Sequence, residues 1–327
     1  MTIALSLGDR YGVGPEIVAA VLAERSGHAP PLLVVGDVAV LERGARDVGV
    51  DLDIVTVTAP VVPAGRTWAV LGRPADIPVE PLGRVTPEAG RECLDTLVAL
   101  ADLATSGAIT AVVYAPLNKS ALKAAGHEAG DELDYLVHRM APAGEVGEIN
   151  ILDDLWTSRV TSHIPVRAVA DALTPHAIVR SIDLIAGALA ASGRPRPRIA
   201  VAGLNPHAGE NGAFGREEID VIAPAVAQAA AAGHDVTGPL PADTVFPLAL
   251  RDGFDGIVTM FHDQGQIALK VLGLGRGITF LAGLPVPVAT PGHGTAYDIA
   301  GKGIARTDGL VAAVDLVTTM TRREEQA

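Results

Sequence analysis

The chain has 327 residues, of which 49% are hydrophobic and only 3% aromatic, and its formal net charge is −13. This length allows two domains, and the abundance of alanine, valine, leucine and glycine is typical of an α/β protein. Because the chain is acidic and has no run rich in lysine and arginine, we expect it to bind neither nucleic acid nor a membrane surface.

Segments typical of strands and of helices alternate along the chain. Strands are expected at residues 2–7, 31–36, 108–116, 198–205, 256–261 and 277–283. Helices are expected at residues 14–25, 38–49, 86–107 and 216–233. This alternation predicts an α/β fold with a mostly parallel sheet and helices on both faces.

The single cysteine and the N-terminus indicate the compartment. Cys93 excludes a disulfide framework and a thiolate metal cluster, and its place in a helical pattern predicts a small buried side chain. The N-terminus opens directly on a predicted strand without a charged leader, and no apolar stretch reaches about 18 residues. We therefore expect a soluble cytoplasmic protein.

Polar and ionisable residues follow four of the expected strands. Because functional groups gather at the carboxyl ends of strands in open α/β sheets, this favours an enzyme over a structural module. The residues in question are Gly8, Asp9 and Arg10; Pro116, Asn118 and Lys119; Asn205, Pro206 and His207; and His262, Asp263 and Gln264.

Three histidines from separate loops suggest a metal site. His163, His207 and His262 each lie at a strand end or in a loop bounded by proline or glycine. Three imidazoles with open positions suit a catalytic transition metal such as zinc, iron, manganese or cobalt. The spacing is long and irregular, so hydrogen-bonded structural histidines are the alternative. Asp263 could orient an imidazole or take part in acid–base chemistry.

Two glycine-rich loops are candidate ligand sites. "GDRYGVGPE" at residues 8–16 joins a strand to a helix and could receive an anion, although an ordinary strand–helix turn explains it equally well. In "HGTAYDIAGKGIA" at residues 293–305, the glycines allow close backbone approach, and Asp298 and Lys302 are spaced as at a helix start. In isolation, this second pattern is a turn followed by a helix cap.

Taken together, the segments resemble the 4-hydroxythreonine-4-phosphate dehydrogenase (PdxA-like) family over almost the whole chain. The segments that carry the resemblance are "GDRYGVGPEI", "APLNKSAL", "HIPVRAV", "GLNPHAGENGAFGREEID", "GPLPADTVF", "FHDQGQIALKVLG" and "GHGTAYDIAGKGIA". "NPHAGE" and "HDQG" are the most specific, and the last segment is also similar to the nucleotide loop of isocitrate and isopropylmalate dehydrogenases.

The resemblance implies an NAD- or NADP-dependent, metal-requiring homodimer whose active site is shared between subunits. It implies a nucleotide-side domain at residues 1–126 plus 286–327 and a metal, substrate and dimerisation domain at residues 127–285, with a cleft between them. The implied metal ligands are His163, His207 and His262. The implied catalytic residues are Lys119, Asp243 and Asp263. The implied nucleotide site comprises Gly292, His293, Gly294, Thr295 and Asp298. Gln264 and Lys270 are expected near the substrate.

The chain departs from the family pattern where the substrate is selected. Phosphate-using members have a Gly-His-Thr run where this chain has Asp131, Glu132 and Leu133, and they have an asparagine and an arginine where this chain has Thr279 and Val288. Loss of the arginine removes a charge-assisted contact of about 1.5–3 kcal/mol to a phosphate. The alternative is that loop shifts bring in Arg276 or Arg10 as a substitute. Arg10 stands where the family usually has proline, and it is a candidate cation for binding a distal carboxylate of the substrate.

Three functions are compatible with these residues. The departures favour a dehydrogenase of an unphosphorylated hydroxy acid with decarboxylation, such as conversion of 1,2-dihydroxy-3,5-cyclohexadiene-1,4-dicarboxylate to protocatechuate. In that case an apolar wall of Val286, Val288 and Leu133 would face the substrate ring. The alternative is a dehydrogenase of a phosphorylated hydroxy acid: 4-hydroxythreonine 4-phosphate, or threonate or erythronate 4-phosphate. A non-catalytic binding homologue is the third possibility.

Overall fold

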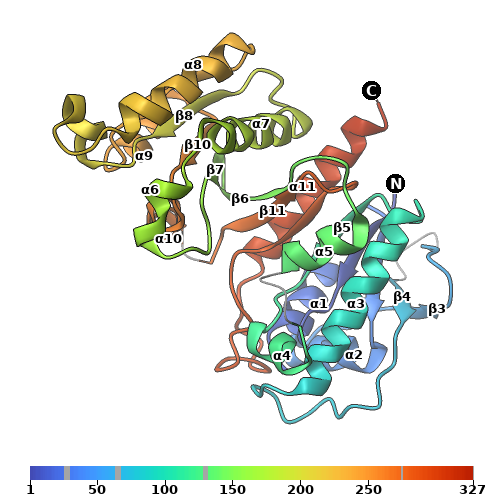
Figure 1. Cartoon of the computed structure of the whole chain (residues 1–327). Helices are drawn as coiled ribbons and strands as arrows, with labels where there is room; N and C mark the ends of the chain where they lie inside the picture. The colour runs from blue at the N-terminus through green and yellow to red at the C-terminus, as the bar shows by residue number, and fades with distance from the viewer. Residues whose placement is uncertain (26–29, 63–67, 128–131, 274, 327) are drawn as a thin grey trace. The chain divides into compact units, whose positions relative to one another are not determined.

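The computed structural model describes residues 1–25, 30–62, 68–127, 132–273 and 275–326 (Figure 1). The chain divides into two compact units: unit 1 comprises Met1–Ala143 and Leu284–Ala327, and unit 2 comprises Gly144–Gly283. The sequence analysis placed these boundaries after residues 126 and 285. In the structure His127 and residues 132–143 belong to the first unit, where helix α5 (Glu132–Met140) packs on α3 (Pro87–Thr105).

Unit 1 contains a parallel sheet with the strand order β3-β4-β2-β1-β5-β12. The strands are β1 (Ile3–Ser6), β2 (Leu32–Gly36), β3 (Ile54–Val57), β4 (Trp68–Gly72), β5 (Ala111–Tyr114) and β12 (Val288–Pro291). Strands β1, β2 and β5 are buried at every position. Near-continuous apolar runs of this kind are expected of strands covered on both faces.

The helices of unit 1 pack in two groups. Helix α1 (Gly14–Glu24) packs on α2 (Val38–Val48) and on α11 (Asp308–Glu324), while α3 packs on α4 (Lys119–Ala124) and on α5. Local chemistry defines several helix starts: the side chains of Asp37, Thr86 and Asn118 accept hydrogen bonds from the first turns of α2, α3 and α4. Figure 1 shows α3 crossing in front of the strands of this unit.

Unit 2 contains a mixed sheet with the strand order β11-β6-β7-β10-β8-β9. The strands are β6 (Gly147–Leu152), β7 (Leu155–Arg159), β8 (Arg198–Ala202), β9 (Asp235–Leu240), β10 (Gly256–Thr259) and β11 (Ile278–Ala282). Strand β6 runs antiparallel to both neighbours, whereas β7, β10, β8 and β9 are mutually parallel. The fold is thus α/β and mostly parallel, as the sequence predicted.

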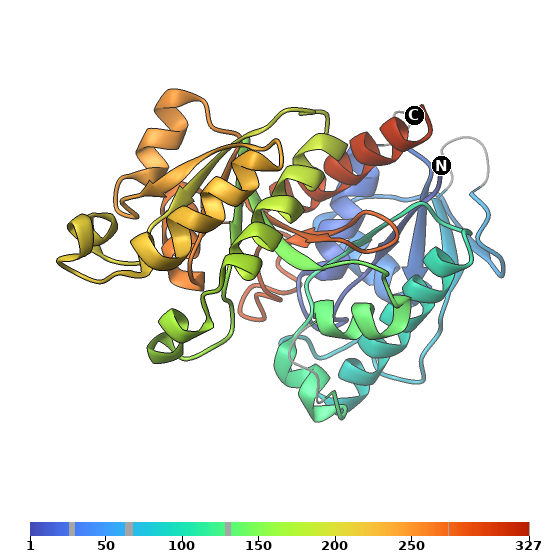
Figure 2. The ribbon, with the colours of Figure 1, turned by 45° about the horizontal axis from the view of Figure 1, so that its top comes forward.

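Helices also cover both faces of the unit 2 sheet. Helix α7 (Pro175–Ala191) packs on β7 and β10 and lies beside α8 (Ala223–Ala231), as Figure 2 shows. On the other face, α9 (Val245–Asp252) and α10 (His262–Gly273) contribute Val245, Phe246 and Leu269 to a core with strand residues such as Ile257. The remaining helical segments are 3₁₀ turns at Val166–Ala168 and Pro206–Gly212, a π-helical segment at Glu218–Ile222, and α6 (Val169–Ala172).

The expected strands and helices all occur, with three refinements. The predicted helix at residues 216–233 is a π-helical segment that continues into α8. The helix start suggested at Asp298 and Lys302 is wrong, because residues 297–301 form turns, residues 302–303 form a bend and α11 begins only at Asp308. Gly301 and Gly303 have φ angles of 79° and 64°, which a right-handed helix does not allow. Strands β3, β4, β6, β7, β9 and β12 were not predicted.

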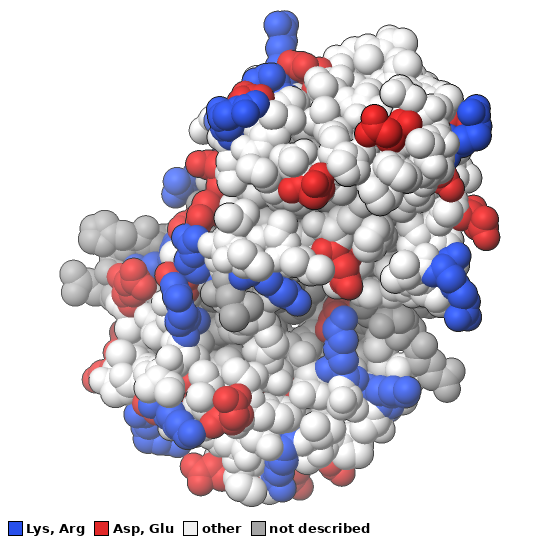
Figure 3. All heavy atoms as spheres, turned by 90° about the vertical axis from the view of Figure 1, so that its left-hand side faces the viewer, with Lys and Arg blue, Asp and Glu red and all other residues white. Residues whose placement is uncertain are grey.

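Cys93 is 3% exposed and packs with Leu94 and Leu122, which confirms the expected small buried side chain. Burial raises the pKa of its thiol. On the face drawn in Figure 3, basic and acidic side chains are interspersed among uncharged ones.

No single helix in the described part of the chain is both long and apolar enough to span a bilayer; one bent pair, Val166–Ala172 with Pro175–Ala191, passes on length and composition alone.

Candidate active site

Unit 2 brings the three predicted metal-binding histidines to one edge of its sheet. His163 follows β7, His262 begins α10 directly after β10, and His207 follows β8. Strands β7, β10 and β8 are adjacent and parallel, so their carboxyl ends lie side by side. This is the edge at which α/β proteins place their functional groups.

His163 and His262 form a close pair. The centroids of their rings are 5.9 Å apart, with an interplanar angle of 44°. The Nδ1 atom of His262 lies 2.7 Å from Oδ1 of Asp263, which leaves Nε2 of this ring for a ligand. A carboxylate bound to the second nitrogen orients a metal-binding imidazole and raises its basicity. Asp263 therefore occupies the orienting position that the sequence suggested.

His207 lies on the neighbouring strand end in an unusual backbone. Residues 207–211 all have positive φ angles, so the chain makes a left-handed turn, which is costly for residues other than glycine. The His207 side chain is 70% exposed, with Nδ1 3.8 Å from a carboxylate oxygen of Glu210 and its ring 6.1 Å from that of Phe214. Among the described residues, no three histidine, cysteine, aspartate or glutamate side chains converge as a ready metal site.

Two residues tie the loops of this edge to the sheet. The side chain of Gln264 accepts a hydrogen bond from the Met260 N–H (2.8 Å) and donates one to the Gly203 carbonyl (3.0 Å), so it joins the ends of β10 and β8. Glu218, which the sequence analysis did not single out, is 3% exposed. Its carboxylate accepts from the backbone N–H groups of Leu204 and Asn205, both at 2.7 Å, and from the Asn205 amide.

Burial by itself would raise the pKa of Glu218, but the hydrogen bonds from Asn205 and Leu204 outweigh it and hold the pKa below the ordinary value. A buried carboxylate that caps the "NPHAG" turn could have been suspected from "GREEID", but sequence alone does not distinguish Glu217 from Glu218.

Glu218→Gln is expected to reduce the free energy of unfolding by about 2–3 kcal/mol, because the charge-assisted bonds to the turn are lost. The measurement is denaturant unfolding followed by circular dichroism. Glu217→Gln, which removes a single bond to the Asn205 side chain, is the matched control. Equal losses in the two variants would contradict the role assigned to Glu218.

Unit 1 brings together Lys119 and Glu132, a predicted catalytic residue and a predicted substrate residue. The Lys119 ammonium, at the start of α4, lies 4.0 Å from the Glu132 carboxylate on α5, and the Lys119 side chain is 66% exposed. Leu133 beside it is half-buried. Asp131, named with these residues in the sequence analysis, lies outside the described residues.

The predicted nucleotide loop packs against the first strand–helix loop of unit 1. The Val13 N–H donates to the Thr295 carbonyl (2.9 Å), and the Tyr297 hydroxyl donates to Asp9 (2.6 Å). A Cβ on Gly12 would lie 2.8 Å from Thr295, so only glycine fits there. The Nε2 atom of His293 is buried and has no hydrogen-bond partner among the described residues, which fits a group left for a ligand. Gly292, Gly294 and Asp298 are exposed.

Asp9 is fully buried, and burial raises its pKa against the opposing hydrogen bonds from Tyr297 and the Tyr11 N–H. Because the pKa of Asp9 is higher in the folded protein than in the unfolded chain, where it is 3.8, the folded protein binds this proton more tightly. The resulting contribution to the free energy of unfolding is fully present below pH 3.8 and is lost as pH rises through the folded-state pKa. We therefore expect Asp9→Asn to become more stable relative to wild type as pH rises above 3.8 through the folded-state pKa. Denaturant unfolding against pH checks this; exposed Asp51→Asn is the control, and parallel curves for Asp9→Asn and wild type would contradict it.

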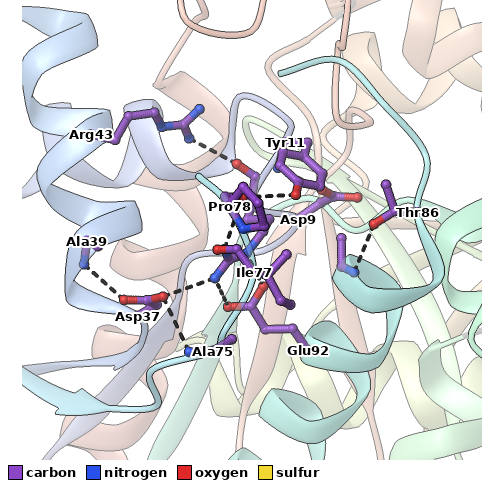
Figure 4. Close-up of polar contacts among 12 residues, drawn as sticks. Asp9, Tyr11, Asp37, Ala39, Arg43, Ala75, Ile77, Pro78, Thr86 and Glu92 are labelled. Atoms are coloured by element: carbon purple, nitrogen blue, oxygen red, sulfur yellow. Dashed lines mark hydrogen bonds and ion pairs between the residues drawn. The ribbon is translucent and has the colours of Figure 1, made fainter. Parts of the chain in front are cut away.

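The structure assigns Arg10 a different role from substrate binding. Its side chain is 1% exposed, and it donates to Glu92 (2.6 and 2.9 Å), to Asp37 (3.0 Å) and to the carbonyls of Ile77 and Pro78. These bonds use all five N–H groups of the guanidinium. In Figure 4 the partners Asp37, Ile77, Pro78 and Glu92 are labelled, and dashed lines mark the hydrogen bonds and ion pairs between the residues drawn. The suggestion that Arg10 binds a distal carboxylate is therefore wrong for this structure, because it has no donor left.

The other predicted substrate residues are dispersed. Val288 is fully buried in β12, paired with Val112, so it forms no apolar wall facing a substrate. Thr279 in β11 accepts a hydrogen bond from the Asn150 amide (3.0 Å). Lys270 on α10 and Asp243, in the turn before α9, are both exposed.

Comparison with known proteins gives consistent results. Residues 28–317 match the family model described as pyridoxal phosphate biosynthetic protein PdxA. A 4-hydroxythreonine-4-phosphate dehydrogenase from Beijerinckia indica is 40% identical over 324 residues, covering 97% of this chain and 94% of that protein. A D-threonate 4-phosphate dehydrogenase from Bordetella bronchiseptica is 39% identical over 321 residues, covering 96% and 91%.

Two solved structures extend the similarity. The 4-hydroxythreonine-4-phosphate dehydrogenase of Klebsiella pneumoniae has a TM-score of 0.85 and 37% identity, with 98% of each chain covered. The terephthalate 1,2-cis-dihydrodiol dehydrogenase of Burkholderia xenovorans has a TM-score of 0.67 and 31% identity, also with 98% of each chain covered. With the sheet edge and loops described above, these matches establish that the chain belongs to the PdxA family, whose named relatives are dehydrogenases.

Proposed function

We propose that this protein is a dehydrogenase that depends on NAD or NADP and on a divalent metal, and that oxidises a hydroxyl group of a phosphorylated hydroxy acid. The substrates in view are 4-hydroxythreonine 4-phosphate and threonate or erythronate 4-phosphate. The observation that carries the proposal is the 39–40% identity, over nearly the full length of both chains, to relatives named for the first two of these substrates. Oxidation of an unphosphorylated hydroxy acid with decarboxylation, which the sequence departures favour, is the second candidate.

His163 and His262 would hold the metal. Two imidazoles 5.9 Å apart between ring centroids, one of them oriented by Asp263, fit two ligands of a single transition metal such as zinc, iron, manganese or cobalt. His207, on the adjacent strand end, is the candidate third ligand, supplied in a homodimer whose active site is shared between subunits. A bound divalent metal supplies Lewis acidity that lowers the pKa of a substrate hydroxyl.

The remaining residues position the substrate and transfer the proton. Lys119, held near Glu132, is the candidate acceptor of the hydroxyl proton, and exposed Asp243 is a second acid–base group. The loop of Gly292, His293, Gly294 and Thr295 would bind the nicotinamide nucleotide, with buried Nε2 of His293 as a hydrogen-bonding atom for it. Hydride transfer itself belongs to the nucleotide.

A second candidate is the decarboxylating dehydrogenase of an unphosphorylated diol acid. The observations that favour it are Thr279 and Val288 in place of the family's asparagine and arginine, and the 31% identity to the terephthalate dihydrodiol dehydrogenase. Burial of Val288 weakens the part of this argument that relied on an apolar wall.

The test is reduction of NAD and of NADP by the metal-reconstituted protein with four substrates. These are 4-hydroxythreonine 4-phosphate, D-threonate 4-phosphate, D-erythronate 4-phosphate and the terephthalate cis-dihydrodiol. Turnover of a phosphate ester supports the first candidate. If the protein oxidises the dihydrodiol with release of carbon dioxide but oxidises no phosphate ester, the second candidate replaces the first. Turnover of none of the four would reject both.

A further inference from the structure

A polar cluster in unit 2 lies next to the histidine pair and is not used by the function proposed above. Its centre is Arg159, the last residue of β7, whose side chain is 8% exposed. Nε of Arg159 donates to the Ser162 hydroxyl (2.9 Å), directly before His163 in the chain. The two terminal nitrogens donate to the side chains of Asn150 and Glu148, both on β6.

Asn150 connects this arginine to two further elements. Its Oδ1 also accepts a hydrogen bond from the Gln266 amide on α10 (2.6 Å), and its own amide donates to Thr279 on β11. Gln266 lies four residues after His262, and Lys270 lies four residues after Gln266, so the three share one face of α10. The cluster therefore borders the loop of His163 on one side and the helix of His262 on the other.

Holding the sheet together does not require this cluster. Strand β6 already pairs through its backbone with both β7 and β11. Moving a guanidinium and a carboxylate out of water carries a desolvation penalty that their attraction barely offsets, so a nearly buried Arg–Glu pair is a weak stabiliser. Arginine is, however, the side chain best suited to planar, bidentate recognition of carboxylate and phosphate oxygens.

We propose that Arg159 binds the oxyanion group of the substrate, a phosphate ester or a carboxylate, and that Glu148 occupies the guanidinium when no substrate is bound. The proposal rests on the proposed function, since it assigns the anionic end of the hydroxy acid. Bonds to described residues use three of the five N–H groups of Arg159. The Glu148 side chain is 20% exposed, so its displaced carboxylate returns to water. Thr279 and Lys270 provide a hydroxyl and a second cation on the elements that border the cluster.

Two substitutions are expected to act in opposite directions. Arg159→Gln raises KM for the anionic substrate by about 10- to 100-fold with little change in kcat, because the lost contact holds an end of the substrate that does not react. Glu148→Gln removes the competing carboxylate and lowers KM. Arg198→Gln, on strand β8 of the same sheet with a side chain 46% exposed, is the control and leaves KM unchanged. If the pair is only a structural link, both substitutions raise KM or unfold the protein together, and the proposal is overturned.

Anion-induced stabilisation tests the same site without turnover. The Tm of the metal-loaded protein is measured with inorganic phosphate and with succinate, and the anion that matches the site raises it. A rise with phosphate alone identifies a phosphate-ester site, and a rise with succinate alone a carboxylate site. The rise is expected to disappear in Arg159→Gln and to grow in Glu148→Gln; Arg159→Lys, which keeps the charge, serves if the glutamine variant does not fold.

Failure of the Arg159 assignment and failure of the proposed function give different results. A shift that persists in Arg159→Gln, or the absence of any shift in wild type, overturns the assignment of Arg159 even if a hydroxy acid is oxidised. A shift that depends on Arg159 in a protein that oxidises none of the four substrates rejects the proposed function and supports the anion site.

Discussion

Arg10→Ala is expected to reduce the free energy of unfolding by about 3–5 kcal/mol, because removal of one partner leaves buried carboxylates without their counter-charge. The side chains of Asp37 and Glu92 are 10% and 14% exposed, so little water replaces the guanidinium. The carbonyls of Ile77 and Pro78 lose a donor at the same time. Denaturant unfolding of the purified variant measures the loss.

The matched control is Arg139→Ala, since Arg139 makes a bidentate pair with Asp102 on the surface. A much smaller loss is expected there, because exposed pairs contribute little. The double variant Arg10→Ala/Glu92→Gln is expected to recover part of the stability, since it removes one of the uncompensated charges. A loss in Arg10→Ala no larger than in Arg139→Ala would show that the buried network does not stabilise unit 1.

His163→Ala and His262→Ala are each expected to reduce kcat by more than about 100-fold and to lower metal content. Removing a side chain that only hydrogen-bonds to a metal-binding imidazole typically reduces metal affinity or activity by about 10- to 100-fold, and removing a direct ligand is expected to reduce them further. Asp263→Asn is expected to produce this smaller, 10- to 100-fold loss in metal affinity. Activity assays with the substrate identified above and elemental analysis provide the two measurements.

His176→Ala is the control for the histidine variants, because His176 lies in the same unit and its side chain is 83% exposed. It is expected to retain wild-type activity and metal content. Retention of full metal content in both His163→Ala and His262→Ala would reject this pair as ligands. His207→Ala then decides the third position: a loss equal to that of His262→Ala supports His207 as the remaining ligand.

The amino-acid pattern alone was sufficient to predict the α/β class and the main buried strands. Alternating apolar strands and amphipathic helices have a strong local signature, and β1, β2, β5, β8, β10 and β11 all carry it. The weaker strands were missed for a physical reason: β3 is partly exposed, and β9 contains Gly238 and Pro239, which are depleted in strands. The three histidines were also identifiable as candidates, because each lies at a strand end or in a loop bounded by proline or glycine.

The role of Arg10 could be decided only by the tertiary structure. From the sequence, an arginine at the end of the first strand looked available to a ligand. Its acceptors come from residues 27 to 82 positions away in the chain, and no local pattern encodes their convergence on one guanidinium. Val288 is a similar case, since a valine at a substrate-selecting position proved to be fully buried in a sheet.

For the histidine site too, the sequence indicated the candidate residues, whereas the tertiary structure decided which side chains surround them. Strand order places β7, β10 and β8 side by side, and that pairing, rather than spacing along the chain, brings the ring centroids of His163 and His262 to 5.9 Å from each other. Asn150 and Arg159 had no sequence signal, and "GREEID" did not distinguish Glu218 from Glu217, because a polar residue in an apolar segment is informative only when its partners are known. Local chemistry thus determined the elements and the candidate residues, whereas long-range pairing decided which side chains meet and which are buried.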